Sequence, residues 1–377
     1  MKYNSFLFVA MLISIISFSQ ERKRAREYGV KVGILATGKN NSITDVFGVK
    51  VGHVTLNSFD SIKTGVTAII PHRGNLFQQK VPAGIFIGNG FGKLAGISQI
   101  KELGNIESPI ILTNTLNVAE GIQGIIDYTI SQKGNEQVQS VNAIVGETND
   151  GTLNDIRGRH VKPSDVFKAI QIADTGKVEE GNVGAGTGTV CFGFKGGIGT
   201  SSRKLPNSLG GYTVGVLVQT NFGGVLQING APVGEELGKY YLKDKLNNPV
   251  DGSCMIIVAT DAPLDSRNLE RLAKRAFMGL AKTGGIASNG SGDYVIAFSN
   301  NVINLVPHST NEKVLKNTFL SNDEISPLFM AAIEATEEAI INSLFMAETT
   351  NGKNGKIIES IPLEKIIPIL KKYNKIK

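Results

Sequence analysis

The stretch DGSCMIIVAT (251–260) decides the fold, because it joins a polar segment abruptly to an apolar strand. Residues 254–260 form a short run rich in Ile and Val, which is typical of a buried strand. The preceding residues 231–251 are polar and charged and carry turn residues, which predicts an exposed loop. Gly252 and Ser253 therefore lie where a polar loop ends and a rigid strand begins.

Similar strand patterns recur on both sides of this point, mixed with helical ones. The predicted strands are 30–35, 49–55, 65–70, 83–88, 110–113, 141–145, 212–220, 254–260 and 294–299. The predicted helices are 118–131, 164–173, 268–282 and 326–347. The mixture indicates the α/β class with substantial sheet, and with 41% hydrophobic residues in 377 we expect one folded domain.

The N-terminus is typical of a signal peptide. Lys2 precedes an apolar run from Phe6 to Phe18, which is too short to span a bilayer comfortably, and small residues at Ser17 and Ser19 precede Gln20. We expect residues 1–19 to be removed and the protein to be exported, periplasmic or secreted. An uncleaved membrane anchor is the alternative.

The formal charge of +6 does not predict a nucleic-acid partner, because it is concentrated at the ends. Lys2, residues 21–27 and residues 371–377 together carry +7, so the rest of the chain is close to neutral. We interpret both basic ends as solvated flanks.

Neither a metal nor a nucleotide is indicated by the remaining motifs. The four histidines lie far apart and match no metal-ligand spacing, and whether Cys191 and Cys254 pair cannot be decided from sequence. The glycine-rich run 181–199 lacks the strand, helix and acidic residue of a dinucleotide site. We expect tight packing or a backbone-lined pocket there, and no cofactor.

Cleavage between Gly252 and Ser253 would put a hydroxyl and a free α-amine on one residue. The α-amine has an ordinary pKa of about 7.7 to 8.0, so it can accept a proton near neutral pH. Glycine before the serine suits a self-cleaving bond, which needs an unhindered carbonyl. By itself, Gly-Ser before a strand is a common pattern.

The Gly-Ser pattern becomes specific when the surrounding motifs are considered. Through GSCMIIVATDAPL (252–264) and SNGSGDYVIAFS (288–299), the chain resembles the L-aminopeptidase/D-amidase-esterase and β-peptidyl aminopeptidase family, and the resemblance covers nearly the whole mature chain. It extends through residues 42–55, 80–118, 145–161, 193–203, 214–224 and 334–352.

This resemblance implies an αββα sandwich, with two stacked sheets between helical layers. It further implies self-cleavage into an α chain (20–252) and a β chain (253–377), commonly assembled as a homotetramer. Ser253 would be the N-terminal nucleophile and would be supported by the hydroxyl of Ser291 and the carboxylate of Asp293.

Two further roles follow from the same resemblance. Asn221 in QTNFGG would stabilise the oxyanion, and Glu147 in VGETND would hold the free ammonium of a small peptide or amide substrate. Asn149 stands where some members have a tyrosine, which affects the expected pocket contacts. Asp293 is shorter by about one methylene than the glutamate of other members.

Two alternatives are distinguished from this interpretation. Ornithine acetyltransferases share the self-cleaving fold, but they use an N-terminal threonine, and neither Ser253 nor an exported precursor fits them. A non-catalytic periplasmic binding protein could also keep a glycine-lined pocket on this fold. Failure to cleave, together with tight ligand binding, would favour the binding protein.

Overall fold

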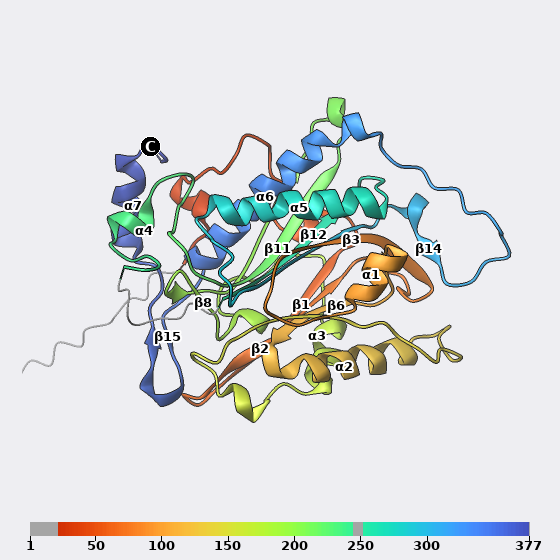
Figure 1. Cartoon of the computed structure of the whole chain (residues 1–377), viewed down its shortest axis with the longest axis horizontal. Coiled ribbons are helices and arrows are strands. Elements are labelled where there is room, and N and C mark those ends of the chain that lie inside the picture. The colour runs from red at the N-terminus through yellow and green to blue at the C-terminus, as the bar shows by residue number, and fades with distance from the viewer. Residues whose placement is uncertain (1–21, 244–251, 377) are drawn as a thin grey trace, which may run out of the picture.

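The computed structural model describes residues 22–243 and 252–376. They form four layers, with two stacked sheets between two pairs of helices (Figure 1). One sheet has the order β1-β2-β6-β7-β4, with bounds Lys50–Ser58, Ile62–Ile70, Ile110–Asn114, Ile144–Thr148 and Leu94–Ala95. The predicted αββα sandwich is thus confirmed.

The second sheet carries the DGSCMIIVAT strand. Its order is β10-β11-β12-β13-β3-β14, with β5 also paired to β3. The bounds are Ile198–Lys204, Thr213–Asn221, Ser253–Thr260, Gly292–Ser299, Gln79–Gly90 and Val306–Pro307, with β5 at Asn105–Ile106. β12 is antiparallel to β11 and parallel to β13, so it is central and shielded on both edges.

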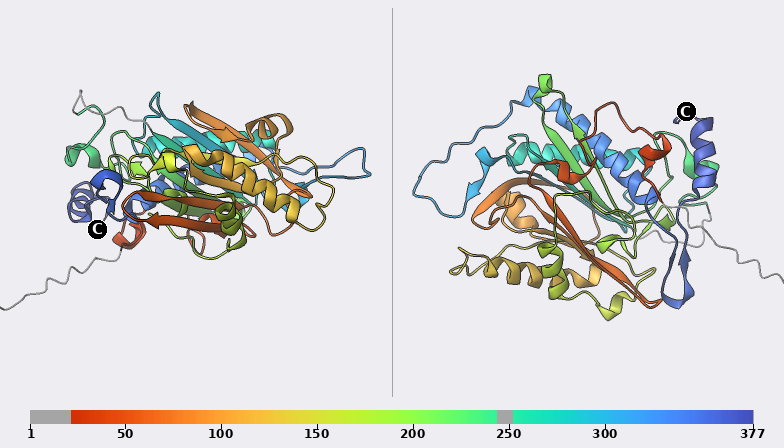
Figure 2. Two further views of the ribbon diagram at one scale, coloured as in Figure 1. Left: turned by 90° about the horizontal axis from the view of Figure 1, so that it is seen from below. Right: turned by 180° about the vertical axis from the view of Figure 1, so that it is seen from behind.

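Helices cover the outer face of each sheet. α5 (Ser266–Lys282) and α6 (Ser326–Phe345) pack on the larger sheet, and α2 (Val118–Ser131) and α3 (Pro163–Gln171) pack on the smaller one (Figures 1 and 2). The remaining helices are α1 (Ile97–Leu103), α4 (Val233–Glu236) and α7 (Leu363–Lys372). Two small hairpins complete the fold, β8–β9 (Val190–Cys191, Phe194–Lys195) and β15–β16 (Thr350–Asn351, Ile357–Ile358).

The two faces of β12 lie in different cores. Cys254, Ile256 and Val258 pack under α5 and α6, whereas alternate residues such as Met255 and Ile257 pack between the two sheets. By the same alternation, Ser253 faces the space between the sheets. A strand buried on both faces explains why 254–260 is continuously apolar.

The glycine-rich run packs tightly, as expected. A Cβ on Gly199 would lie 1.9 Å from the carbonyl oxygen of Ala339, so α6 approaches β10 closely only because this residue has no side chain.

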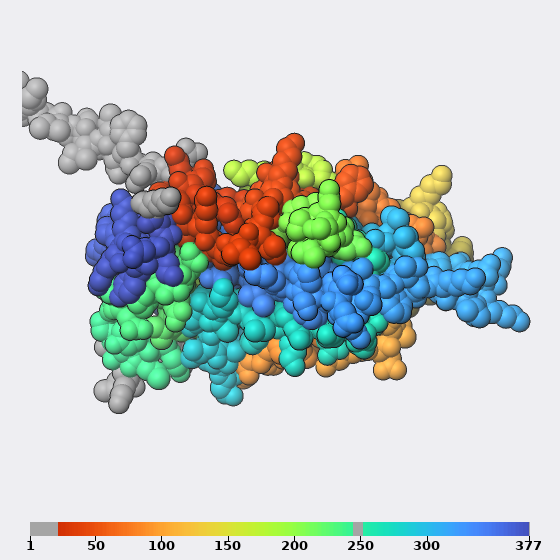
Figure 3. All heavy atoms as spheres, turned by 90° about the horizontal axis from the view of Figure 1, so that it is seen from above, coloured from red at the N-terminus to blue at the C-terminus, as the bar shows by residue number. Residues whose placement is uncertain are grey.

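Two predictions about the N-terminal part are wrong. Residues 30–35 form no strand, since they run beside α6 and the carboxylate of Glu334 accepts the amides of Ile34 and Leu35. Residues 22–27 are not a solvated flank either. Arg24 is buried and paired with Glu180, and Arg26 pairs with Glu338 on α6. Figure 3 shows the N-terminal residues in red beside the blue residues of α6.

The loop prediction for 231–251 holds only in part. Val233 and Gly234 are buried in α4, which packs on α7, and residues 244–251 lie outside the described residues. β10 and α7 were not predicted. In the part of the chain described here, no helix is long and apolar enough to cross a membrane.

Candidate active site

Ser253 occupies the first position of β12, at the meeting point of three strands. In the sheet register it lies opposite Asn221 of β11 on one side and opposite Gly292 of β13 on the other. Its side chain is buried. The two neighbouring strands therefore place a side-chain amide and a backbone amide next to the Ser253 hydroxyl.

The Gly252–Ser253 peptide is held by hydrogen bonds on its carbonyl oxygen. The Ser253 hydroxyl donates to the Gly252 oxygen at 2.6 Å, and the Gly292 amide donates to the same oxygen at 3.1 Å. The Gly292 amide also lies 3.4 Å from the Ser253 Oγ. The Gly292 amide draws electron density from the Gly252 carbonyl, which favours attack on its carbon by the adjacent Ser253 Oγ.

Glycine is needed at position 292 because the backbone there is crowded. A Cβ would lie 2.9 Å from the Cα of Gly92 and 3.0 Å from the carbonyl oxygen of Phe91. Without a side chain, β13 can begin close enough to β12 for its first amide to reach the Gly252 oxygen.

Asn221 is the last residue of β11, and its amide group has a fixed orientation. The Val190 amide donates to Asn221 Oδ1 at 2.9 Å, so the oxygen points towards the β8–β9 hairpin. Asn221 Nδ2 donates to no other described residue, and it is free to serve an external acceptor. An oxyanion donor needs such an unpaired N–H group.

Ser291 and Asp293 lie at the start of β13, both almost fully buried. The Ser291 hydroxyl and the Asp293 carboxylate form no hydrogen bond of ordinary geometry with a described residue, although the Ser291 hydroxyl and the Cys254 amide are close enough to the carboxylate to stabilise its charge. Burial raises the pKa of Asp293 to about 6, although the nearby Ser291 hydroxyl and Cys254 amide oppose the rise.

The Asp293 side chain is not next to Ser253. Asp293 pairs with Cys254, so it lies on the helix-covered face of the sheet, whereas Ser253 lies on the opposite face. Any support from Asp293 must therefore pass through an intermediate such as Ser291. The relay that the resemblance implies remains a prediction.

Glu147 comes from β7 of the other sheet, and its carboxylate lies near the start of β13. It is buried in β7, which excludes a surface or helix-capping role. Its Oε1 accepts the Lys93 amide at 2.9 Å, and its Oε2 accepts the Thr115 hydroxyl. A Cβ on Gly92 would lie 3.2 Å from Oε1 and 3.0 Å from the Gly292 Cα, so the carboxylate is on the β13 side of Ser253.

Asn149 lines a pocket on the β11 side. The pocket has a volume of about 1210 Å³ and includes Asn149, Asn221 and Phe222 among its lining residues. Asn149 Oδ1 accepts the Gly151 amide at 2.9 Å, which shapes the turn after β7. A Cβ on Gly252 would lie 3.1 Å from the Cα of Phe222, so Gly252 packs against one of the residues that line this pocket.

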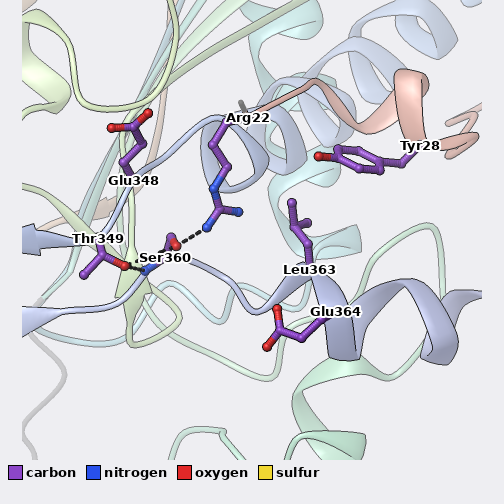
Figure 4. A pocket seen from close by; sticks show the side chains of 7 residues that line it. All are labelled: Arg22, Tyr28, Glu348, Thr349, Ser360, Leu363 and Glu364. Atoms are coloured by element: carbon purple, nitrogen blue, oxygen red, sulfur yellow. Dashed lines mark hydrogen bonds between the residues drawn. The ribbon is translucent and has the colours of Figure 1, made fainter. Parts of the chain in front are cut away.

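A second pocket, of about 310 Å³, holds none of the predicted site residues. Arg22 reaches into it and donates to Ser360 (Figure 4). Arg22 also donates to the Ile361 carbonyl oxygen. The pocket belongs to the contact between the N-terminal segment and the residues before α7.

Other titratable groups near the site are structural. Cys191 and Cys254 are free and buried, and burial raises the pKa of Cys191 to about 12, so it is an unreactive thiol. Burial lowers the pKa of Lys195 to about 7, and its ammonium donates to the carbonyl oxygens of Gly186 and Gly196. No group of three or more potential metal ligands occurs within 22–243 and 252–376.

Sequence reasoning missed the groups that orient the site. Thr115 lies in the LTNTLNV stretch and holds Glu147, yet nothing in that stretch marks a threonine as functional. Asn89 donates to the carbonyl oxygens of Ser288 and Ser291 and so fixes the turn before β13. Backbone donors such as Gly292 are invisible in a sequence because every residue except proline carries one.

Comparisons with known proteins agree with this geometry. Residues 41–358 match Peptidase family S58. The β-peptidyl aminopeptidase BapA of Sphingosinicella microcystinivorans is 42% identical, over 95% of this chain and 94% of that protein.

Two solved structures are similar along nearly their whole length. A protein of Pyrococcus horikoshii OT3 is 48% identical with a TM-score of 0.86, covering 93% of this chain and 99% of that one. The L-aminopeptidase D-Ala-esterase/amidase of Ochrobactrum anthropi, a serine aminopeptidase with a variant of the Ntn hydrolase fold, is 33% identical with a TM-score of 0.86. Here 94% of this chain and 99% of that one are covered.

These relatives support an aminopeptidase over an acyltransferase or a binding protein, and they confirm the expected hydrolase class. The sandwich fold, the serine that opens its central strand and the similarity along the chain lead to one conclusion. This chain belongs to peptidase family S58.

Proposed function

We propose that the chain is a self-cleaving serine aminopeptidase that removes the N-terminal residue from small peptides, amides or esters. The observation that carries the proposal is the arrangement at Gly252 and Ser253. A hydroxyl at the start of a central strand lies 2.6 Å from the oxygen of the preceding carbonyl, which a backbone amide also polarises.

Self-cleavage would use the groups already in place. Ser253 Oγ attacks the Gly252 carbonyl carbon, the C–N bond breaks, and the hydroxyl proton passes to the peptide nitrogen, which becomes the α-amine of Ser253. Water then hydrolyses the ester between Gly252 and Ser253. The products are the chains 20–252 and 253–377, and the Gly292 amide supports the oxyanion in both steps.

The mature enzyme would repeat this chemistry on substrate. The substrate ammonium binds Glu147, Ser253 Oγ attacks the first carbonyl carbon, and the α-amine of Ser253 accepts the hydroxyl proton. Asn221 Nδ2 and the Gly292 amide stabilise the oxyanion. The leaving amine takes the proton, and water releases the acyl group from Ser253.

The buried carboxylate of Glu147 supports an exopeptidase over an endopeptidase. An ammonium that pairs with Glu147 must belong to a free N-terminus, because an internal amide carries no charge. The names of the relatives, which include β-peptidyl aminopeptidases, make β-aminoacyl peptides the first substrates to try.

The proposal includes export and assembly. Removal of residues 1–19 would deliver the protein to the periplasm or the exterior, and the resemblance to the family supports a homotetramer. Residues 1–19 lie outside the described residues.

Substrates with a free N-terminal amine and substrates with an acetylated one test the activity directly. Aminoacyl p-nitroanilides with α-, β- and D-configured acyl residues should be hydrolysed with a free amine and resist hydrolysis when N-acetylated. Glu147→Gln should lower kcat/KM by about 100-fold, mainly through KM, because a charged hydrogen-bonded pair is lost. Equal rates on free and acetylated substrates would contradict the proposed role of Glu147.

A further inference from the structure

The pocket beside Asn221 has an uneven distribution of charge. Among its lining residues within 22–243 and 252–376, four are lysines and none is acidic. They are Lys239, Lys243, Lys353 and Lys356. Since the chain outside its two ends is close to neutral, this concentration of positive charge is a local feature of the pocket.

The pocket and Glu147 lie on opposite sides of the nucleophile. Glu147 is on the β13 side of Ser253, near Gly92 and Gly292. The pocket is on the β11 side, where it is lined by residues 221–224. A substrate anchored by its ammonium at Glu147 and attacked by Ser253 would therefore extend its leaving group towards the lysines.

Two of the four lysines are available to an external anion. The other two already have partners. The Lys239 ammonium lies over the ring of Phe194 and is attracted by the charge of Glu359, and Lys243 donates to the Gly238 carbonyl oxygen. The side chains of Lys353 and Lys356 form no hydrogen bond or ion pair with any residue of 22–243 and 252–376. Their ammonium groups thus have no partner in the described part of the chain, which leaves them able to bind an external anion.

The segment that carries these two lysines has a fixed position. Lys353 and Lys356 lie in the β15–β16 hairpin, which projects beyond the ends of the sheets in Figure 2. The Lys353 amide donates to the Leu153 carbonyl oxygen at 2.8 Å, and a Cβ on Gly352 would lie 2.6 Å from Leu153 Cδ2. The hairpin therefore packs on the turn that follows Glu147 and Asn149.

We propose that this pocket binds the leaving-group side of the substrate and that Lys353 and Lys356 recognise its C-terminal carboxylate. The substrate class is then short peptides with both ends free, in preference to peptide amides. With about 1210 Å³, the pocket has room for more than a single leaving residue. The inference rests on the proposed aminopeptidase activity, which sets the direction of the substrate.

A pair of matched substrates tests it. For one acyl residue that the enzyme accepts, kcat/KM is measured on the dipeptide and on its C-terminal amide. We expect the wild-type enzyme to prefer the free acid by about fivefold, the effect of two exposed ion pairs. The preference should shrink in 0.5 M NaCl, because salt screens exposed charges.

The double variant Lys353→Gln with Lys356→Gln should lose the preference while its rate on the amide stays within twofold. Lys168→Gln with Lys177→Gln is the control, because both lysines are exposed and outside the pocket. Equal rates on acid and amide in the wild-type enzyme, or a preference that survives the double variant, would overturn the inference and leave the aminopeptidase intact. Failure of the wild-type enzyme to hydrolyse any aminoacyl substrate would overturn the proposed function itself.

Discussion

At the scale of single residues, the site depends on which atoms of Asn221 remain free. The Val190 amide occupies Oδ1, so only Nδ2 can donate to a developing oxyanion. Replacement by aspartate keeps the acceptor for Val190 and removes the donor, which separates the two roles of this side chain.

Asn221→Asp should therefore lower kcat by about 100- to 1,000-fold, the usual cost of losing one oxyanion donor. The rate is measured per mole of cleaved enzyme, so that slower maturation does not enter the result. A kcat within threefold of wild type would show that Asn221 Nδ2 does not stabilise the oxyanion.

Asp293 gives a prediction about pH. Its folded pKa of about 6 exceeds the usual value near 3.9, so the folded protein holds this proton more tightly than the unfolded chain. Its contribution to the free energy of unfolding is greatest below about pH 4, falls by about 3 kcal/mol between pH 4 and 6, and is constant above that.

Asp293→Asn should remove this slope. The comparison is made by urea unfolding in the Ser253→Ala background, where the chain stays intact, at pH values from 4 to 7. The asparagine variant should be more stable than its parent at pH 7 and differ less at pH 4. A difference that does not change with pH would mean that Asp293 titrates at its ordinary pKa.

Sequence motifs predicted the side chains of the candidate site, but they did not predict the residues that orient those side chains. Ser253, Asn221 and Glu147 belong to motifs whose residue types match the chemistry; the sheet register pairs Asn221 with Ser253, and the Glu147 carboxylate lies near the start of β13. The positions of Asp293 and Ser291 depend on strand register and side-chain rotamer, which no motif encodes.

At the scale of elements, buried ion pairs join the N-terminal segment to α6. The Arg203 guanidinium on β10 is fully buried and contacts Glu334 at 2.9 Å and Glu338 at 2.7 Å. Glu334 also holds residues 34 and 35, and Glu338 also pairs with Arg26. The network connects three segments that are distant in sequence.

Arg203→Ala should destabilise the intact chain by about 3–5 kcal/mol, because it leaves two carboxylates buried without their partner. Arg267→Ala is the matched control, since Arg267 is 58% exposed and lies 3.8 Å from Asp265. The control should change the free energy of unfolding by less than about 0.5 kcal/mol. Similar losses in the two variants, measured by urea unfolding, would show that the network adds no specific stability.

The pattern of apolar residues predicted most elements, and tertiary contacts account for the failures. Helix 118–131 was predicted with its observed bounds, because its apolar residues lie on one face. Residues 30–35 have a strand composition, but their amides bond to Glu334 and not to a neighbouring strand. β10 was not predicted because it begins in a glycine-spaced run that lacks the usual pattern of apolar side chains. The structure shows that Gly199 leaves room for the backbone of α6 to approach β10 closely.

At the scale of the whole molecule, cleavage before Ser253 would divide the sheet that contains β12 between two chains. β10 and β11 would belong to the first chain and β12 and β13 to the second, yet they are paired along their lengths. The first chain also supplies β3 on the far side of β13. The two products should remain associated after cleavage, because each buries apolar strands against the other.

The mass of the purified mature protein shows whether the bond between Gly252 and Ser253 is cut. Denaturing mass spectrometry should find two polypeptides, 20–252 and 253–377, which elute together under native conditions. The Ser253→Ala chain should remain in one piece and be inactive. An active wild-type protein that consists of a single uncut chain would contradict the account.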